Sequence, residues 1–301
     1  MTAERWAHLL ARLGCRVEVV ERYGGEPLDL LIALHAGRGA AAVRGFRQRF
    51  PSRPVVMAVT GTDIYGDAFH PSEVANVLAA ADRVVVLQPR TADDLPEAVR
   101  PRVRVIFQSA EPPKRRESVR PDLFEVAVVG HLRPVKDPFR AAEASRLLGP
   151  ESRLRIVHLG EALSPDMADR ARAEAASNPR YEWLGDLPHD AALAVVSRCR
   201  LVVLTSLSEG GPAVIPEGIV AGVPVIASRV AGCVGMLGDD YPGLFPPGDT
   251  RALAQLFCRA EREPGFYESL QAACDRLRPL FRPEAELAAW ASLLAELKLG
   301  P

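Results

Sequence analysis

The sequence predicts an α/β protein built from two doubly wound parallel-sheet domains. Three observations support this prediction. Short apolar runs alternate with amphipathic helical stretches almost throughout, one segment rich in proline and charge interrupts the alternation, and the 301 residues exceed what one hydrophobic core usually serves. Parallel strands need long crossover connections, usually helical, which is the rhythm seen here.

The first domain is expected over residues 1–119. A helix over residues 3–14 comes first, and strands are expected at residues 15–20, 28–34, 54–59, 83–88 and 103–107. A doubly wound domain normally opens with a strand and a glycine-bearing turn, so we expect this domain to lack its first strand. Residues 109–122 are rich in proline and charge and read as a linker.

The second domain is expected over residues 120–283, where the rhythm restarts. Strands are predicted at residues 124–130, 154–160, 181–185, 200–206 and 223–228, with helices at 136–148, 164–176, 190–199 and 212–222. After Thr250 the pattern is helical, and a last helix over about 284–298 is expected to pack back on the first domain.

Charge balance, cysteine spacing and hydropathy argue against several kinds of partner and site. The 37 basic residues balance 38 acidic ones, so we expect neither nucleic acid nor a membrane surface as a partner. The five cysteines are scattered without a C-x-x-C pair, which argues against a disulfide framework and a zinc site. No apolar run reaches the roughly 18 residues of a membrane span, and we expect a cytoplasmic protein without a metal.

Two carboxylates follow the strand at 200–206. Ligands of open parallel sheets bind beyond the carboxyl ends of the strands, and here the chain reads Ser-Glu209-Gly210-Gly211-Pro. Glycines let the backbone approach a ligand, and a helix start favours an anion. Glu217 is expected about two turns into the same helix. Capping of the helix dipole by Glu209 and simple solvation of Glu217 are the alternatives; paired carboxylates that accept from vicinal hydroxyls around a phosphate indicate a nucleotide sugar.

A second anchor follows the strand at 124–130. Gly130 ends that strand, and a helix is expected to begin near Lys136. Arg133 and Lys136 would then face the same ligand as the double glycine and neutralise a diphosphate. An ordinary solvated surface is the alternative for either side chain taken alone.

Three segments carry a family resemblance. "SEGGPAVIPEGIVAGVPVIAS", "VVGHLRPVKDP" and "GLFPPGDTRALA" resemble the E-x(7)-E signature and the neighbouring motifs of family-4 type glycosyltransferases, over residues 120–270. This resemblance implies the GT-B fold, in which two Rossmann-like domains face a central cleft, with a UDP-sugar as substrate and neither metal nor other cofactor. It implies catalytic roles for Glu209, Arg133 and Lys136. It also implies that the sugar donor is bound by six residues: Glu217, Gly210, Gly211, Gly130, His131 and Leu187. The family's arginine after the glycine is His131 here, so Arg133 is expected to supply that charge.

A second resemblance, in the first half of the chain, indicates which acceptor substrate the protein uses. Phrases such as "DLLIALHAGR", "VVMAVTGTDIY" and "VRVIFQSAEPP" resemble the selenosugar synthases of selenoneine biosynthesis. That resemblance implies transfer of N-acetylglucosamine or glucose from a UDP-sugar to selenophosphate. Related transferases often carry histidine at the position of Thr60, so an alcohol acceptor would miss a general base, whereas selenophosphate is already anionic. The expected acceptor-binding residues are Arg38, Arg90, His35, Thr62 and Asp63.

Three other functions fit the same sequence. A transferase of the same fold could use an ordinary hydroxyl acceptor, and an epimerase or hydrolase would consume the UDP-sugar without any acceptor. A catalytically inactive nucleotide-sugar-binding protein would bind the donor without turning it over.

Overall fold

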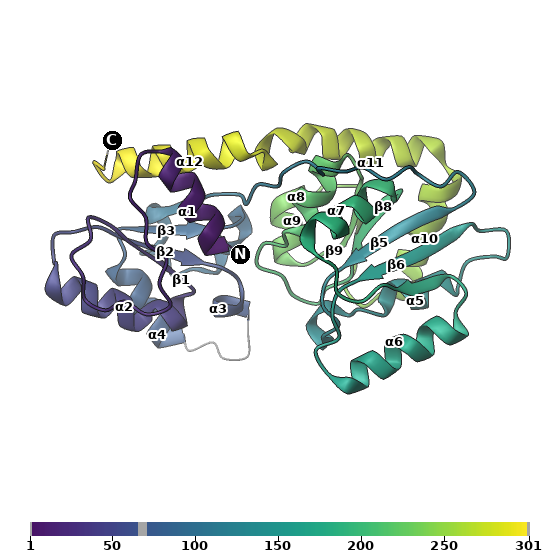
Figure 1. Cartoon of the computed structure of the whole chain (residues 1–301), viewed down its shortest axis with the longest axis horizontal. Coiled ribbons are helices and arrows are strands. Elements are labelled where there is room, and N and C mark those ends of the chain that lie inside the picture. Colours follow the sequence, from purple (N-terminus) through teal and green to yellow (C-terminus); the bar gives the residue numbers. More distant parts are fainter. Residues whose placement is uncertain (1, 66–70, 300–301) are drawn as a thin grey trace. The chain divides into compact units, whose positions relative to one another are not determined.

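The chain forms two compact units. The computed structural model describes residues 2–65 and 71–299 (Figure 1). Unit 1 comprises Met1–Gln108 and Pro283–Pro301, and unit 2 comprises Ser109–Arg282. Each contains one parallel sheet covered by helices, which confirms the predicted class of two α/β domains. Within the described residues no helix is long and apolar enough to cross a membrane.

The boundary between the units lies earlier than the expected 119/120. Residues 109–119 lack regular structure, as predicted for a linker, but hydrogen bonds hold them to unit 2. The amide of Ala110 donates to a carbonyl near the end of unit 2 (3.0 Å), and the Arg116 guanidinium donates to the Ala221 carbonyl (2.9 Å). Glu117 pairs with Arg198 (2.7 Å). These bonds make the segment part of unit 2.

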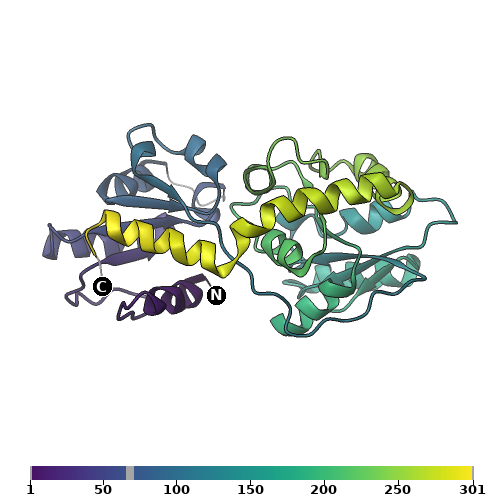
Figure 2. The ribbon, with the colours of Figure 1, turned by 90° about the horizontal axis from the view of Figure 1, so that it is seen from above.

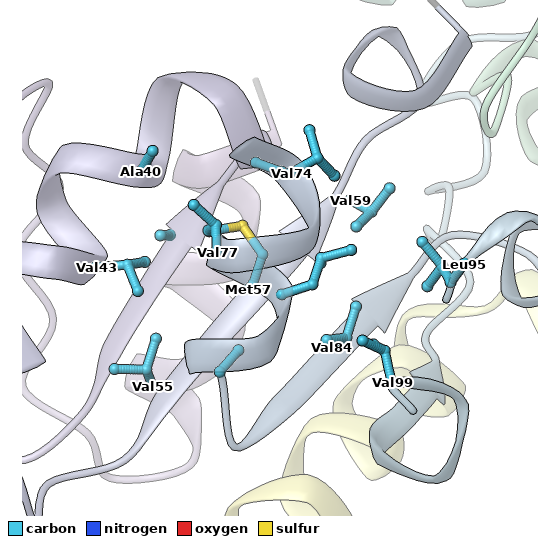
Figure 3. Packing of buried hydrophobic residues seen from close by; sticks show 14 of the residues in the cluster. Ala40, Val43, Val55, Met57, Val59, Val74, Val77, Val84, Leu95 and Val99 are labelled. Carbon is cyan, nitrogen blue, oxygen red and sulfur yellow. The ribbon is translucent and has the colours of Figure 1, made fainter. Parts of the chain in front are cut away.

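Unit 1 is a four-stranded parallel sheet in the order β1-β2-β3-β4. Its strands are β1 (Leu31–Leu34), β2 (Val55–Val59), β3 (Arg83–Val86) and β4 (Val103–Val105). Helices α2 (Ala36–Arg49) and α4 (Pro71–Ala80) pack on one face of the sheet (Figure 3). Helices α1 (Thr2–Arg12) and α12 (Pro283–Glu296) pack on the other. Short turns complete the unit: α3 (Thr62–Tyr65), η1 (Pro89–Asp94) and η2 (Arg100–Arg102).

Burial on both faces explains the continuous apolar runs of this sheet. Val55, Met57 and Val59 belong to the core cluster under α2 and α4, while Val56 and Ala58 belong to the cluster under α1 and α12. An alternating pattern is therefore absent from β2, as is typical of a parallel strand covered on both sides. The sequence signal of such a strand is a short run of β-branched residues.

The last helix belongs to unit 1 although it ends the chain. The rings of Trp6 in α1 and Trp290 in α12 meet edge to face at 4.9 Å between centroids, and the Trp6 indole donates to Glu286 (2.7 Å). At the other end of α12, Glu296 bonds Arg83 (2.8 Å) and Arg104 (2.9 Å). Figure 2 shows the length of α12 as the last, yellow segment.

The predicted strand at residues 15–20 is wrong. These residues have no regular secondary structure, and Val17, Val19 and Val20 are 37%, 52% and 55% exposed. β1 is the edge of the sheet and pairs with β2 alone, and the described residues contain no strand before it. A strand needs a hydrogen-bonded neighbour, which this β-branched run does not have.

Unit 2 contains a six-stranded parallel sheet in the order β10-β9-β8-β5-β6-β7. The strands are β5 (Phe124–Val129), β6 (Leu154–Leu159), β7 (Tyr181–Trp183), β8 (Leu201–Leu204), β9 (Val225–Ser228) and β10 (Leu244–Phe245). The helices are α5 (Arg140–Ser145), α6 (Pro165–Ser177), α7 (His189–Arg198), α8 (Val214–Ala221), α9 (Ala231–Leu237), α10 (Thr250–Arg262) and α11 (Pro264–Leu277). Two 3-10 turns, η3 (Pro134–Lys136) and η4 (Arg278–Phe281), complete the unit.

The strand order creates a switch point between β5 and β8. From β5 the chain builds β6 and β7 on one side, and it then returns to place β8 on the other side of β5. The loops that follow β5 and β8 therefore leave neighbouring strands in opposite directions. In doubly wound folds this arrangement opens the ligand-binding crevice at the carboxyl edge of the sheet.

Candidate functional site

The loops after β5 and β8 are fixed against each other at the switch point. The amide of Leu207 donates to the Val135 carbonyl (2.8 Å). The buried Thr205 hydroxyl lies within hydrogen-bond distance of the carbonyls of Lys136 (3.0 Å) and Asp137 (2.9 Å). The backbone that carries Lys136 is thus held by the residues directly after β8.

This geometry brings Lys136 and Glu209 into contact. The Lys136 ammonium lies 2.5 Å from Oε1 of Glu209, and the Ser206 hydroxyl donates to the same oxygen (2.6 Å). Ser228 in turn donates to the Ser206 carbonyl (2.5 Å). The Glu209 and Lys136 side chains are 10% and 24% exposed, so the pair is mostly shielded but reachable. Both contacts use Oε1, and Oε2 has no partner among the described residues.

Helix α9 supports Glu209 from behind. A Cβ at Gly232 would lie 2.3 Å from the Glu209 carbonyl oxygen, so only glycine permits this approach. Burial, and to a lesser degree the charge of Glu209, raises the pKa of the Cys233 thiol. The thiol therefore stays protonated and is not a nucleophile here.

Glu217 lies close to the helix start, whereas the sequence placed it two turns inside. Helix α8 begins at Val214, two residues later than expected, because the double glycine and Pro212 belong to the preceding loop. Glu217 is therefore in the first turn, with its side chain 19% exposed and Oε1 3.9 Å from Nδ1 of His189. Local patterns could not place His189 there, because a histidine at the start of α7 is adjacent to α8 only in the folded chain.

The other residues that were expected to bind the sugar donor lie in loops at the same carboxyl edge of the sheet. Gly130 follows β5 directly, and His131 and Arg133 are exposed in the loop that leads to Lys136. This loop contains the short turn η3, and the regular helix α5 begins only at Arg140, later than expected. Leu187 is partly exposed in the loop after β7.

A buried histidine fixes the Gly130 carbonyl. His158, at 0% exposure, bonds the Gly130 oxygen through Nε2 (3.2 Å) and the Tyr181 hydroxyl through Nδ1 (2.9 Å). A carbonyl can only accept, so Nε2 carries the proton and Nδ1 accepts from tyrosine. Burial lowers the pKa of His158 to about 4 and keeps it neutral. The sequence alone left this histidine without a role.

Protonation of His158 predicts a pH-dependent stability. The unfolded histidine titrates near 6.5 and the folded one at about 4, so between these values the unfolded state binds more protons. We expect this one side chain to remove about 3 kcal/mol of unfolding free energy as pH falls through that window. Urea unfolding from pH 7.5 to 4 should show a weaker pH dependence for His158→Gln than for the native chain.

The exposed His8 provides the control for this measurement. His8→Gln should keep the native pH dependence, since the His8 side chain is exposed and lacks the burial that acts on His158. An unchanged slope in His158→Gln would contradict the assignment.

In unit 1, the residues expected to bind the acceptor lie in the segments after β1, β2 and β3. His35 follows β1, is partly exposed and caps helix α2, where its Nδ1 accepts from the Arg38 amide (3.3 Å). The Arg38 side chain is exposed. Arg90 lies in η1 after β3, with Nη1 4.0 Å from Asp93. The Thr62 side chain lies outside the described part of the structure.

Asp63 is buried and fully engaged with the backbone. At 3% exposure, its carboxylate accepts from the amides of Ala36 (2.9 Å), Thr60 (3.0 Å) and Gly61 (2.7 Å). The sequence placed Asp63 on the acceptor, but this carboxylate connects two loops of unit 1. Its contacts are those of a structural anchor.

Among the described residues, no group of three or more His, Cys, Asp or Glu side chains is arranged to hold a metal ion. The positive groups that the site itself offers are Lys136, Arg133 and the start of α8.

Comparison with known proteins places this geometry in context. A 2-deoxystreptamine glucosyltransferase from Streptomyces kanamyceticus is 30% identical over 198 residues, which cover 64% of this chain and 49% of that protein. The chain thus spans about half the length of this relative.

Solved structures share the fold. HepE of Anabaena in complex with UDP matches with a TM-score of 0.76 and 18% identity, covering 89% of this chain and 79% of that one. The sucrose-phosphate synthase of Thermosynechococcus elongatus matches with a TM-score of 0.73 and 21% identity, covering 90% and 74%. At such identities the likeness establishes a GT-B glycosyltransferase fold and no more.

The family model of the group 1 glycosyl transferases matches residues 111–275, which is more than half of the chain. The match includes the loops after β5 and β8, with Lys136, Glu209 and Glu217. This chain belongs to the group 1 glycosyl transferases.

Proposed function

We propose that the protein is a glycosyltransferase that binds a UDP-sugar at the switch point of unit 2. The contact between Lys136 and Glu209 carries this proposal, because it places a cation and a hydroxyl acceptor side by side at the edge where such folds bind ligands. Glu209 would accept from sugar hydroxyls through Oε2, and Glu217 from the ribose diol. Family membership and the likeness to a UDP-bound structure support the choice of donor.

In this proposal catalysis comes from position and charge. The bond between the anomeric carbon and the diphosphate breaks, and the departing UDP keeps the electron pair. Lys136 and Arg133 stabilise the negative charge that develops on the diphosphate, and the tie from Thr205 fixes the lysine backbone before the reaction. Glu209 holds the sugar ring so that the anomeric carbon faces the nucleophile.

We further propose that the acceptor is selenophosphate and that the sugar is N-acetylglucosamine or glucose. A selenium lone pair attacks the anomeric carbon and forms the C–Se bond as UDP leaves. Water then attacks phosphorus, which releases phosphate and a 1-selenosugar. The resemblance of the first half of the chain supports this acceptor, as does the threonine at position 60, since an anionic nucleophile needs no general base. Arg38 and Arg90 would bind the acceptor phosphate.

The direct test combines either UDP-sugar with selenophosphate under anaerobic conditions, with thiophosphate alongside. Mass spectrometry should find a sugar with the selenium isotope pattern, formed together with UDP. Turnover with alcohol acceptors but not with selenophosphate would show that the acceptor is a hydroxyl compound. UDP-sugar consumption without acceptor would indicate a hydrolase or epimerase, and binding without turnover would indicate an inactive binding protein.

The acceptor site is tested by charge removal. Arg38→Ala and Arg90→Ala should each raise the acceptor KM about tenfold or more and leave the donor KM unchanged, because a lost charge-assisted hydrogen bond costs at least that factor. The exposed Arg16 is the matched control, and Arg16→Ala should behave like the native chain. Equal effects on donor and acceptor KM would remove the assignment.

A further inference from the structure

The backbone of His35 is held in a conformation that non-glycine residues rarely adopt. Its φ is 67° and its ψ is 107°, which lies outside the regions favoured for a residue with a Cβ. Such conformations persist only where the surroundings over-determine them, and they cluster at functional sites.

Three hydrogen bonds fix the two peptide groups that flank this residue. The His35 amide donates to the Ala58 carbonyl of β2 (2.9 Å), and the His35 carbonyl accepts from Gly39 (2.8 Å). The peptide after His35 is held by the Ala36 amide, which donates to Oδ2 of Asp63 (2.9 Å). Of these three partners, Asp63 alone bonds through its side chain; the other two bond through the backbone.

Asp63 is itself held by two further backbone amides. Its Oδ1 accepts from the amides of Thr60 (3.0 Å) and Gly61 (2.7 Å), so the carboxylate connects the loop after β1 to the loop after β2. Hydrogen bonds to an ionised acceptor are about twice as strong as neutral ones, and Ala36 also opens helix α2, whose positive end favours a carboxylate. The carboxylate can therefore hold His35 in its rare conformation.

The resulting orientation determines which ring nitrogen of His35 is presented. Nδ1 faces the backbone and accepts from the Arg38 amide (3.3 Å). A neutral imidazole with Nδ1 as acceptor carries its proton on Nε2. The partly exposed ring thus offers an N–H donor, and it offers no base at that nitrogen.

We propose that Asp63 is a positioning residue that makes the Nε2–H of His35 a hydrogen-bond donor to an oxyanion of the acceptor, such as a phosphate oxygen. This inference rests on the proposed glycosyl transfer for the identity of the ligand. The coupling between Asp63 and His35 does not depend on the proposed glycosyl transfer. Asp63 touches no reacting atom and acts through His35.

The coupling is tested by NMR on the full chain. Long-range ¹H–¹⁵N spectra of its six histidines, with His35→Asn to assign the signal, should show His35 protonated at Nε2 near pH 7.5. Asp63→Asn should shift this signal toward a mixture of tautomers. A His35 ring protonated at Nδ1, or a signal unchanged in folded Asp63→Asn, would overturn the inference even if the chain proves to have another activity.

Activity provides the second arm. His35→Asn retains a residue that tolerates positive φ and an acceptor for the Arg38 amide, but it lacks the Nε2–H. We expect an unchanged or slightly higher Tm and a fall of tenfold or more in kcat/KM for the acceptor, at an unchanged donor KM. Lys298→Asn is the matched control, since Lys298 has φ 59° and is exposed two residues after the end of α12. Native acceptor kcat/KM in folded His35→Asn would overturn the proposal.

Discussion

Replacing Glu209 with alanine is expected to lower turnover about a hundredfold or more. The side chain is held by Lys136 (2.5 Å) and Ser206 (2.6 Å) in one orientation. In the proposed donor site its removal would therefore free the sugar ring and also change the position of the lysine. A loss of orientation of this kind costs about two orders of magnitude in rate. Steady-state measurement of UDP release gives kcat, and calorimetry with UDP shows whether the nucleotide still binds.

A double-mutant cycle separates the two side chains. If Lys136 and Glu209 act as one unit, Lys136→Met together with Glu209→Ala should cost less than the product of the two single effects. Glu263→Gln, at an exposed carboxylate between α10 and α11, is the control and should retain native turnover. A Glu209→Ala variant with native turnover would remove the donor site proposed here.

The second large effect is expected from Gly160→Ala. Gly160 follows β6 with φ +144°, and a Cβ there would lie 2.1 Å from the Gly130 oxygen and 2.9 Å from the His131 amide nitrogen. Both neighbours are backbone atoms and cannot rotate away. Overpacking and backbone strain together should destabilise unit 2 by about 3 kcal/mol or more. The loop after β5 would have to shift, so UDP affinity should fall as well.

Urea unfolding and UDP calorimetry measure both consequences. Gly265→Ala is the control within the same unit, because a Cβ at Gly265 meets nothing within 4 Å and its backbone needs no positive φ. That variant should unfold at native or slightly higher urea concentration. A Gly160→Ala chain with native stability and native UDP affinity would show that the contact between the loops after β5 and β6 is unimportant.

Much of the fold could be predicted because parallel strands leave a strong local signal. Runs such as residues 54–59 and 201–204 are apolar throughout, since helices cover both faces of each sheet. The expected strand at 15–20 has the same β-branched composition, yet it remains exposed coil because no strand lies beside it. Composition measures the tendency to pair, and a partner decides whether pairing occurs.

The candidate site shows the same division. Local sequence was enough to place Lys136 and Glu209 after strands and to mark the double glycine as a loop. It could not find Ser206 as a partner of Glu209, His158 beneath Gly130 or Asp63 as a buried anchor, because each acts through a contact formed only in the folded chain.

The sequence by itself therefore determined the class of fold, most of its strands and the residue types that follow them, since periodicity and turn chemistry are local properties of the chain. Tertiary structure alone decided that β8 lies beside β5, which joins Lys136 to Glu209. It also decided that the Asp63 carboxylate accepts from three backbone amides. Strand order and burial depend on contacts between distant residues, and no local pattern encodes them.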